Sequence, residues 1–140
     1  MPATPVEPSS GDATSATIIV VEPDISVRMV IAEYLRECGY KVVESVSADE
    51  ALAVLEAGRK IDVIMAEVRL AGNLDGFGLT RQIREHHPEI DVILTSGVSR
   101  AANKAGDLCD DGPLEKPYHP QEVVRRINLL HERPRASLTP

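Results

Sequence analysis

Short runs of consecutive apolar residues recur along this chain and constrain its fold more than any other feature. Three of them, at residues 18–21, 63–66 and 92–94, show no alternation of apolar and polar side chains. An unbroken, largely β-branched run of this length is typical of a strand buried on both faces, as in a parallel sheet. A shorter run at residues 41–44 reads as a further strand. The runs therefore predict a parallel sheet.

Amphipathic segments separate these runs. Apolar residues recur at steps of three and four from residue 27 to 38, and Gly39 follows as a left-handed stop, so a helix is expected there. Ser47 and Glu50 have the spacing of a capping box, which predicts that a second helix begins at this point. The order up to the run at residues 63–66 is thus strand, helix, strand, helix, strand.

The second half of the sequence continues the alternation. A third helix is expected at residues 75–86, and Pro120 is suited to the first position of a last helix. Residues 99–108 are expected to form only a short helix, because Asn103 and Gly106 are poor helix formers. Alternating strands and helices with short connections predict an α/β fold: a doubly wound, five-stranded parallel sheet with five helices.

Both ends of the sequence differ in composition from this unit. Residues 1–16 contain three prolines and no apolar period, which predicts a disordered N-terminal arm, and residues 132–140 are expected to form a flexible tail. The folded domain is therefore placed at residues 17–131. Because only tails remain outside it, we expect a stand-alone module without a separate output domain.

Charge and apolar content exclude several partners. The 140 residues include 15 Lys and Arg against 22 Asp and Glu, a net charge of −7, which argues against nucleic-acid binding. The longest purely apolar run is too short to cross a bilayer, so no membrane segment is expected. A cytoplasmic protein is the resulting prediction.

The two cysteines, Cys38 and Cys109, have no CxxC spacing. This excludes a zinc ribbon and a disulfide-dense secreted scaffold, and it favours a reducing compartment. Cys38 lies on the apolar side of the first helix and is expected in the core. Cys109 is expected in an acidic loop with Asp107, where negative charge disfavours the reactive thiolate.

Polar residues follow the predicted strands where each one ends. Glu22 and Asp24 come after the first strand, Glu67 after the third, Thr95 after the fourth, and Lys116 beyond an expected fifth. The carboxyl ends of parallel strands meet at one edge, so these side chains are expected to converge. Carboxylates suit a hard divalent cation, and a lysine ammonium neutralises a phosphoryl group.

At these residues the sequence resembles the receiver domain of bacterial two-component response regulators, which have a flavodoxin-like fold. The resemblance covers about residues 17–131. It implies an acidic pair that holds Mg²⁺, an aspartate after the third strand that accepts phosphate, a Thr or Ser after the fourth, and a Lys before Pro. Thr95 and Lys116 match the last two places. The matching stretches are IIVVEPDISVR, DVIMAEVRLAGNLDGFGL, DVILTSG and LEKPYHPQEV.

Three places depart from the family pattern. Glu67 stands at the phosphoacceptor position, where its extra methylene moves the carboxylate by up to about 1.5 Å. A misplacement of about 1 Å can cost about 10²-fold in rate, so efficient phosphorylation is not expected. Pro23 replaces the second acidic residue and offers no side-chain oxygen. Pro113 replaces the aromatic switch residue, and its ring cannot swing between two positions.

The Mg²⁺ site implied by the resemblance is therefore expected to be weak or absent. Its remaining contacts would be Glu22, Glu67 and the backbone carbonyl of Arg69. Asp24 lies one residue beyond Pro23 and is a possible substitute ligand, but the turn into the first helix is expected to make it a helix cap instead. No other cofactor is expected.

The resemblance predicts a non-enzymatic, atypical receiver that acts as an interaction module in a phosphorelay. Its implied partners are a histidine kinase, a phosphotransfer protein or another regulator, docked on a face with Ile25, Arg28 and Met29, and the protein is expected to be a monomer or weak homodimer. Two interpretations of Glu67 stay open: a built-in partial mimic of phosphoaspartate, or a relic ion pair with Lys116.

A functional phosphoacceptor, phosphorylated by a histidine kinase with Mg²⁺, is the alternative. A flavodoxin-type enzyme is a third class, which the residues after the first strand disfavour. Binding of the flavin phosphate needs a loop rich in Ser, Thr and Gly, whereas Glu22-Pro23-Asp24 would repel phosphate.

Overall fold

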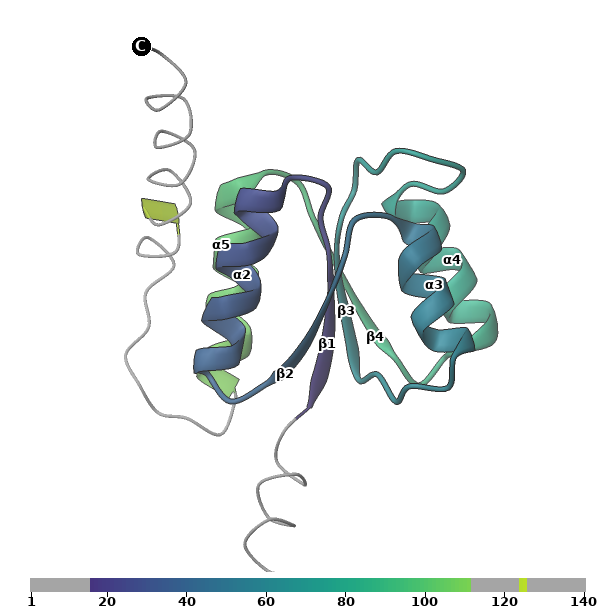
Figure 1. Ribbon diagram of the computed structural model, residues 1–140, viewed down its shortest axis with the longest axis horizontal. Coiled ribbons are helices and arrows are strands. Elements are labelled where there is room, and N and C mark those ends of the chain that lie inside the picture. Colours follow the sequence, from purple (N-terminus) through teal and green to yellow (C-terminus); the bar gives the residue numbers. More distant parts are fainter. Residues whose placement is uncertain (1–15, 112–123, 126–140) are drawn as a thin grey trace, which may run out of the picture.

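Four parallel strands form the centre of the structure, a computed structural model that describes residues 16–111 and 124–125. The strands β1 (Thr17–Val21), β2 (Lys41–Ser45), β3 (Val63–Glu67) and β4 (Asp91–Thr95) pair in the order β2-β1-β3-β4. The helices are α2 (Ile25–Glu37), α3 (Ala48–Glu56), α4 (Gly76–His86) and α5 (Val98–Asp111). Figure 1 shows α2 and α5 on one face of the sheet and α3 and α4 on the other.

The predicted α/β class is confirmed, and so is the parallel pairing of its first four strands. The number of elements differs, because the described residues contain four strands and four helices instead of five of each. The fifth strand expected before Lys116, residues 112–123 and 126–131 of the predicted domain, and the tail at 132–140 lie outside the described residues. So do residues 1–15 of the predicted arm. Val124 and Arg125 are helical, in line with the predicted last helix.

Alternating side chains of the strands supply two separate cores. Along β1, Ile18 and Val20 pack into the core beneath α2 and α5, whereas Ile19 and Val21 pack beneath α3 and α4. Successive side chains of a strand point to opposite faces, so a continuous apolar run is needed to fill both cores. This confirms why the run at residues 18–21 lacks polar positions.

Helix caps predicted from the sequence are formed. The Ser47 hydroxyl accepts a hydrogen bond from the Glu50 N–H at 3.2 Å, and the Glu50 carboxylate accepts one from the Val46 N–H at 2.9 Å. Asp75, predicted only as the start of the third helix, is the cap of α4 and accepts from the Gly78 N–H at 2.8 Å. Gly39 has a φ of 102°, the left-handed conformation that ends α2.

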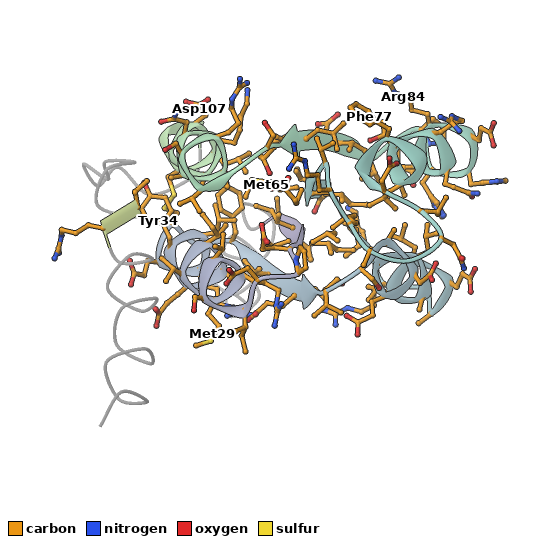
Figure 2. All side chains as sticks on the ribbon, turned by 90° about the horizontal axis from the view of Figure 1, so that it is seen from above. Met29, Tyr34, Met65, Phe77, Arg84 and Asp107 are labelled. Atoms are coloured by element: carbon orange, nitrogen blue, oxygen red, sulfur yellow. A yellow bond between two sulfur atoms is a disulfide. The ribbon has the colours of Figure 1, made fainter. Side chains whose placement is uncertain are left out.

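The segment after β4 differs most from the sequence prediction. In place of a short helix followed by an acidic loop, α5 is a single helix of 14 residues. Ala101, Ala102 and Ala105 are buried against the core shared with α2. Asp107 is exposed on the outer side of α5 (Figure 2) and not at the rim of the site. Burial of this small apolar face outweighs the weak helix propensity of the segment.

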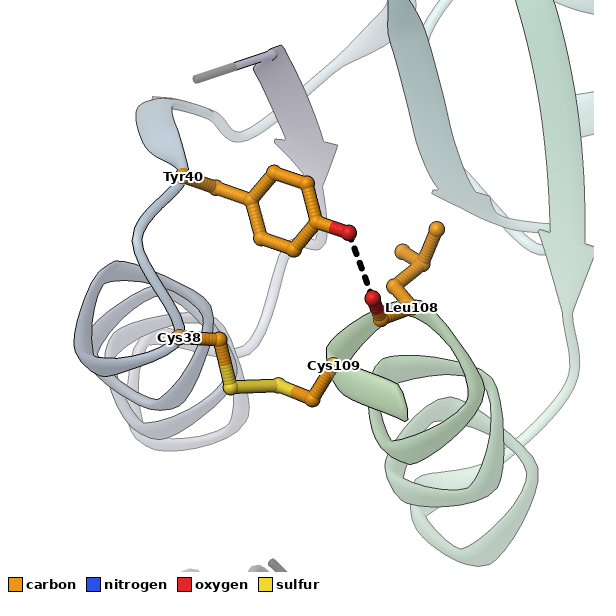
Figure 3. Close-up of a disulfide and its surroundings, with 4 residues drawn as sticks. All are labelled: Cys38, Tyr40, Leu108 and Cys109. Atoms are coloured by element: carbon orange, nitrogen blue, oxygen red, sulfur yellow. Dashed lines mark hydrogen bonds between the residues drawn. A yellow bond between two sulfur atoms is a disulfide. The ribbon is translucent and has the colours of Figure 1, made fainter. Parts of the chain in front are cut away.

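A disulfide joins Cys38 to Cys109 across α2 and α5 (Figure 3). Both residues are buried, and their Cα atoms are 5.5 Å apart. The Tyr40 hydroxyl donates a hydrogen bond to the Leu108 carbonyl beside the bridge. The expectation of an unpaired Cys109 in an acidic loop is therefore wrong, and the cysteines no longer support the inference of a reducing compartment. Among the described helices, none has the length and apolar character needed to span a membrane.

Candidate functional site

The carboxyl edge of the sheet brings together three residues predicted to converge there. Glu67 and Thr95 end β3 and β4 and are paired in register, while Glu22 directly follows the neighbouring strand β1. The Glu22 N–H donates to the Ser45 carbonyl at 3.0 Å, which holds this loop against the end of β2. Lys116 and Pro113, the other predicted members of the site, lie outside the described residues.

The Glu67 carboxylate bridges two loops. Its Oε1 accepts a hydrogen bond from the Gly97 N–H at 3.2 Å, and its Oε2 accepts one from the Arg69 N–H at 3.3 Å. Gly97 belongs to the connection between β4 and α5, whereas Arg69 follows β3 itself. The unmodified side chain thus already links the acceptor strand to the next loop.

Thr95 lies beside Glu67 at this edge, as predicted, but it bonds to the main chain. Its hydroxyl is buried and donates to the Ala66 carbonyl at 3.4 Å. The Val68 N–H donates to the Thr95 carbonyl at 2.8 Å, which extends the pairing of β3 with β4 beyond the strand ends. Thr95 therefore holds the two strand ends together.

Burial raises the pKa of the Glu22 carboxyl above its usual 4.5. The negative charges of Glu67 and Asp24 act in the same direction, while a hydrogen bond from the Asp24 N–H, at 3.0 Å, and the charge of Arg28 lower this pKa. Burial is the main cause of this rise in pKa, and the charge of Glu67 adds a smaller part because both carboxylates lie at the same edge of the sheet.

Asp24 is the N-cap of α2, as the sequence predicted. Its Oδ1 accepts from the N–H groups of Ser26 and Val27 at 2.9 and 3.3 Å. The same oxygen thus satisfies two donors of the first helical turn, which have no partners inside the helix. This use of the side chain directs it toward the helix and away from the role of a substitute ligand for the missing acid at Pro23.

The donor set at this edge does not fit Mg²⁺, which requires near-octahedral oxygen coordination. Pro23 supplies no side-chain oxygen, and both oxygens of Glu67 already accept backbone N–H groups. Within residues 16–111 and 124–125, no three His, Cys, Asp or Glu side chains are grouped so that they could hold a metal ion.

The three residues predicted to face a partner have different environments. Ile25 and Met29 are 59% and 48% exposed, and Figure 2 shows Met29 pointing outward from α2. The Arg28 side chain is only 12% exposed. Its Nε donates to the Glu44 carboxylate at 3.2 Å, and its Nη1 donates to the Glu22 carbonyl at 2.8 Å. Arg28 therefore braces the loop after β1, which corrects its assignment to the exposed face.

The sequence interpretation missed two residues that shape this site, Gly97 and Glu44. Gly97 has a φ of 94°, which few other residues adopt, and its N–H meets the Glu67 carboxylate. A glycine three residues after the apolar run at residues 92–94 was the available signal. Side chains of β2 alternate between the two faces of the sheet, and Glu44 lies on the face that α2 covers. Its pairing with an arginine of that helix could therefore have been predicted.

Comparison with known proteins identifies the family. The model of the response regulator receiver domain matches residues 18–128. The chain belongs to this family. The receiver domain is 34% identical over 125 residues to the transcriptional regulatory protein ResD of Bacillus subtilis, covering 87% of the chain and 51% of ResD. It is 32% identical over 131 residues to the sensor kinase CckA of Brucella abortus, covering 91% of the chain and 14% of CckA.

Solved structures agree with this assignment. A response regulator receiver domain protein from Clostridium thermocellum shares the fold with a TM-score of 0.56 and 24% identity, covering 88% of this chain and 99% of that one. The chain spans about half of ResD and a smaller part of CckA. It is a receiver domain of two-component signalling.

Proposed function

We propose that this receiver domain is an atypical interaction module of a phosphorelay that is not efficiently phosphorylated at Glu67. The observation that carries the proposal is the contact of Glu67 Oε1 with the Gly97 N–H at 3.2 Å. Through it, a carboxylate at the acceptor position occupies the space between the end of β3 and the next loop without any modification. A receiver built this way keeps one conformation of the β4–α5 loop whether or not a phosphodonor is present.

The reactivity of Glu67 as a nucleophile is also reduced. Each of its oxygens accepts a backbone N–H, and these hydrogen bonds stabilise the carboxylate charge and so lower its nucleophilicity. A carboxylate carries one negative charge on two oxygens, compared with about −1.5 to −2 on the three oxygens of a phosphoryl group. Glu67 is accordingly a partial mimic of phosphoaspartate, weaker than the modified residue.

Weak Mg²⁺ binding belongs to the same proposal. Pro23 removes one ligand, and Asp24 is engaged at the start of α2. The neighbouring negative charges of Glu22 and Glu67 attract a cation. Two carboxylates with hydrogen-bonded oxygens nevertheless supply few of the contacts that Mg²⁺ needs. Titration with Mg²⁺ is expected to cause only small amide shifts near Glu22 and Glu67.

The partners we propose are a histidine kinase, a phosphotransfer protein or another regulator, and not nucleic acid or a membrane. The names of similar proteins, a sensor kinase and transcriptional regulatory proteins, support a place in such pathways. Ile25 and Met29 offer exposed apolar surface on the first two turns of α2 for this docking. The net charge of −7 supports the exclusion of nucleic acid. We further propose that the module is monomeric or a weak homodimer.

The test is phosphorylation by acetyl phosphate with Mg²⁺, followed by intact mass. The native chain is expected to stay unlabelled, whereas Pro23→Asp combined with Glu67→Asp restores the acidic pair and the shorter acceptor and gains both labelling and Mg²⁺ binding. Glu67→Asp alone shortens the acceptor without restoring the acidic pair, so it separates the effect of the acceptor from the effect of the cation site. Glu33→Gln, on the exposed side of α2, is the matched control and should behave as the native chain.

Clear labelling of the native chain at Glu67 or Asp24 would instead support a functional phosphoacceptor and overturn the proposal. The relic ion pair with Lys116 is distinguished by a second comparison. If Glu67 acts through Gly97, Glu67→Gln shifts the Gly97 amide signal in the native background and equally in a Lys116→Met background. A shift that disappears in the Lys116→Met background would favour the ion pair.

A further inference from the structure

The disulfide and the acceptor position lie at opposite ends of α5. Helix α5 begins directly after Gly97, whose N–H donates to Glu67, and Cys109 lies in its last turn. A helix of 14 residues is about 21 Å long at 1.5 Å per residue. One helix thus connects the disulfide at the amino edge of the sheet with the contact of Glu67 at the carboxyl edge.

The bridge and a hydrogen bond beside it hold the C-terminal end of α5, whose fully buried side chains are small. The buried side chains of this helix are three alanines, which bury little apolar surface each, and the bridged Cys109, while Val98 and Leu108 are partly buried against the same core. By contrast, α4 packs through the fully buried Leu79 and Ile83. The C-terminal end of α5 is held by the bridge to Cys38 and by the Tyr40 hydroxyl bond to the Leu108 carbonyl (Figure 3).

We propose that the Cys38–Cys109 pair is a redox latch, which fixes α5 on the α2 face when oxidised and, when reduced, loosens α5 and alters the Glu67–Gly97 contact. The exchange partner is a thiol–disulfide couple, either two molecules of a small thiol or one dithiol. A thiolate attacks one bridge sulfur to form a mixed disulfide and releases the other cysteine. A second thiol then displaces the first cysteine. Two electrons and two protons pass to Cys38 and Cys109, and one external disulfide forms.

Burial determines how the latch would open. Cys38 and Cys109 are 0% and 3% exposed, so a thiolate cannot reach either sulfur while α5 is seated. Exchange therefore requires a local opening in which the end of α5 separates from α2. This makes the oxidised state resistant to brief exposure to thiols and ties reduction to movement of the same helix. The latch involves no phosphate, so it does not depend on how Glu67 responds to a phosphodonor.

The first experiment establishes the bridge in the full chain. Protein isolated in air is denatured, treated with iodoacetamide with or without prior dithiothreitol, and weighed intact. Two alkyl groups are expected only after reduction. Alkylation of both cysteines without dithiothreitol would show that the pair is unlinked and would overturn the proposal.

The second experiment follows α5 in the folded protein by hydrogen exchange. Reduction is expected to increase the exchange rate of the amides at residues 98–111 at least about tenfold. This increase is smaller than the full stabilisation that a disulfide usually provides would allow. Amides of α3 and α4 that exchange by local opening should change much less, whereas amides that exchange only by global unfolding report the overall loss of stability. Equal exchange of α5 in both redox states would overturn the latch.

The amide signal of Gly97 tests the link to Glu67 and should shift on reduction. A loosened α5 with an unchanged Gly97 signal would overturn the coupling. The variant with Cys38→Ala and Cys109→Ala serves as the matched control. It should resemble the reduced native chain and show no response to dithiothreitol.

Discussion

The two helix layers of this receiver domain are held to the sheet in different ways. On one face, α3 and α4 pack through large aliphatic side chains such as Leu55, Leu79 and Ile83. On the other, α2 also buries large side chains such as Ile31 and Leu35, whereas the fully enclosed apolar side chains of α5 are alanines and a disulfide joins this helix to α2. Both layers are stabilised by burial of apolar surface, but the second also has a covalent bond, which holds its more lightly packed helix α5. The two faces should therefore respond to different perturbations.

Removal of the disulfide should have the largest effect. Cys38→Ala with Cys109→Ala is expected to lower the free energy of unfolding by about 4 kcal/mol, because the bridge spans 71 residues of sequence and restricts the unfolded chain. Urea denaturation with and without dithiothreitol measures this difference. If the variant unfolds at the same urea concentration as the oxidised native chain, the disulfide does not stabilise the face that carries α2 and α5.

Leu79→Ala tests the opposite face. This side chain is fully buried, so its truncation is expected to cost about 3 kcal/mol, within the range usual for leucine in a core. The loss should be the same in oxidised and reduced protein, since the sheet separates Leu79 from the disulfide and distant effects add. Denaturation of the variant in both redox states measures it, and a loss that depends on redox state would contradict the independence of the two layers.

Helix caps offer a smaller comparison between the faces. Asp24→Ala removes two hydrogen bonds at the start of α2, and Asp75→Ala removes one at the start of α4. Each is expected to cost about 1 kcal/mol, with Asp24 the larger of the two. Thermal unfolding of both variants checks the order. A larger loss at Asp75 would show that the number of capping bonds does not decide the cost.

The fold could be predicted from local patterns because each core strand fills both faces. Continuous apolar runs at residues 18–21 and 63–66 located β1 and β3 to within one residue, and the box of Ser47 and Glu50 located the start of α3. The meeting of Glu22 with Glu67 also followed, since parallel strands end at a common edge. These features depend on neighbours in sequence or on the direction of the chain.

Features that depend on distant contacts could not be predicted in the same way. Helix α5 has weak propensity and gains its length from packing on α2. The pairing of Cys38 with Cys109 depends on which face α5 covers, which the spacing of two cysteines does not reveal. The direction of the Thr95 hydroxyl, toward Ala66 and away from Glu67, is likewise set by the strand ends that surround it.

The smallest expected effect concerns Glu22, which lies where β1 leads into α2. Its pKa is raised in the folded protein, first by burial and then by the nearby charges of Glu67 and Asp24. The folded protein therefore binds more protons than the unfolded chain as the pH rises from 4.5, so Glu22 causes stability to fall through this range. Glu22→Gln should be more stable than the native chain at pH 7.

The gain from Glu22→Gln should vanish below the pKa of the unfolded chain, where the native side chain is already neutral. Urea denaturation at a series of pH values measures it, with Glu33→Gln on the exposed side of α2 as the matched control. A gain that persists undiminished at low pH would mean that packing of the amide is responsible. A loss of stability at pH 7 would mean that the charged form of Glu22 is favoured in the folded protein. The attraction to Arg28 and the hydrogen bond from the Asp24 N–H would then outweigh burial and the repulsion by Glu67.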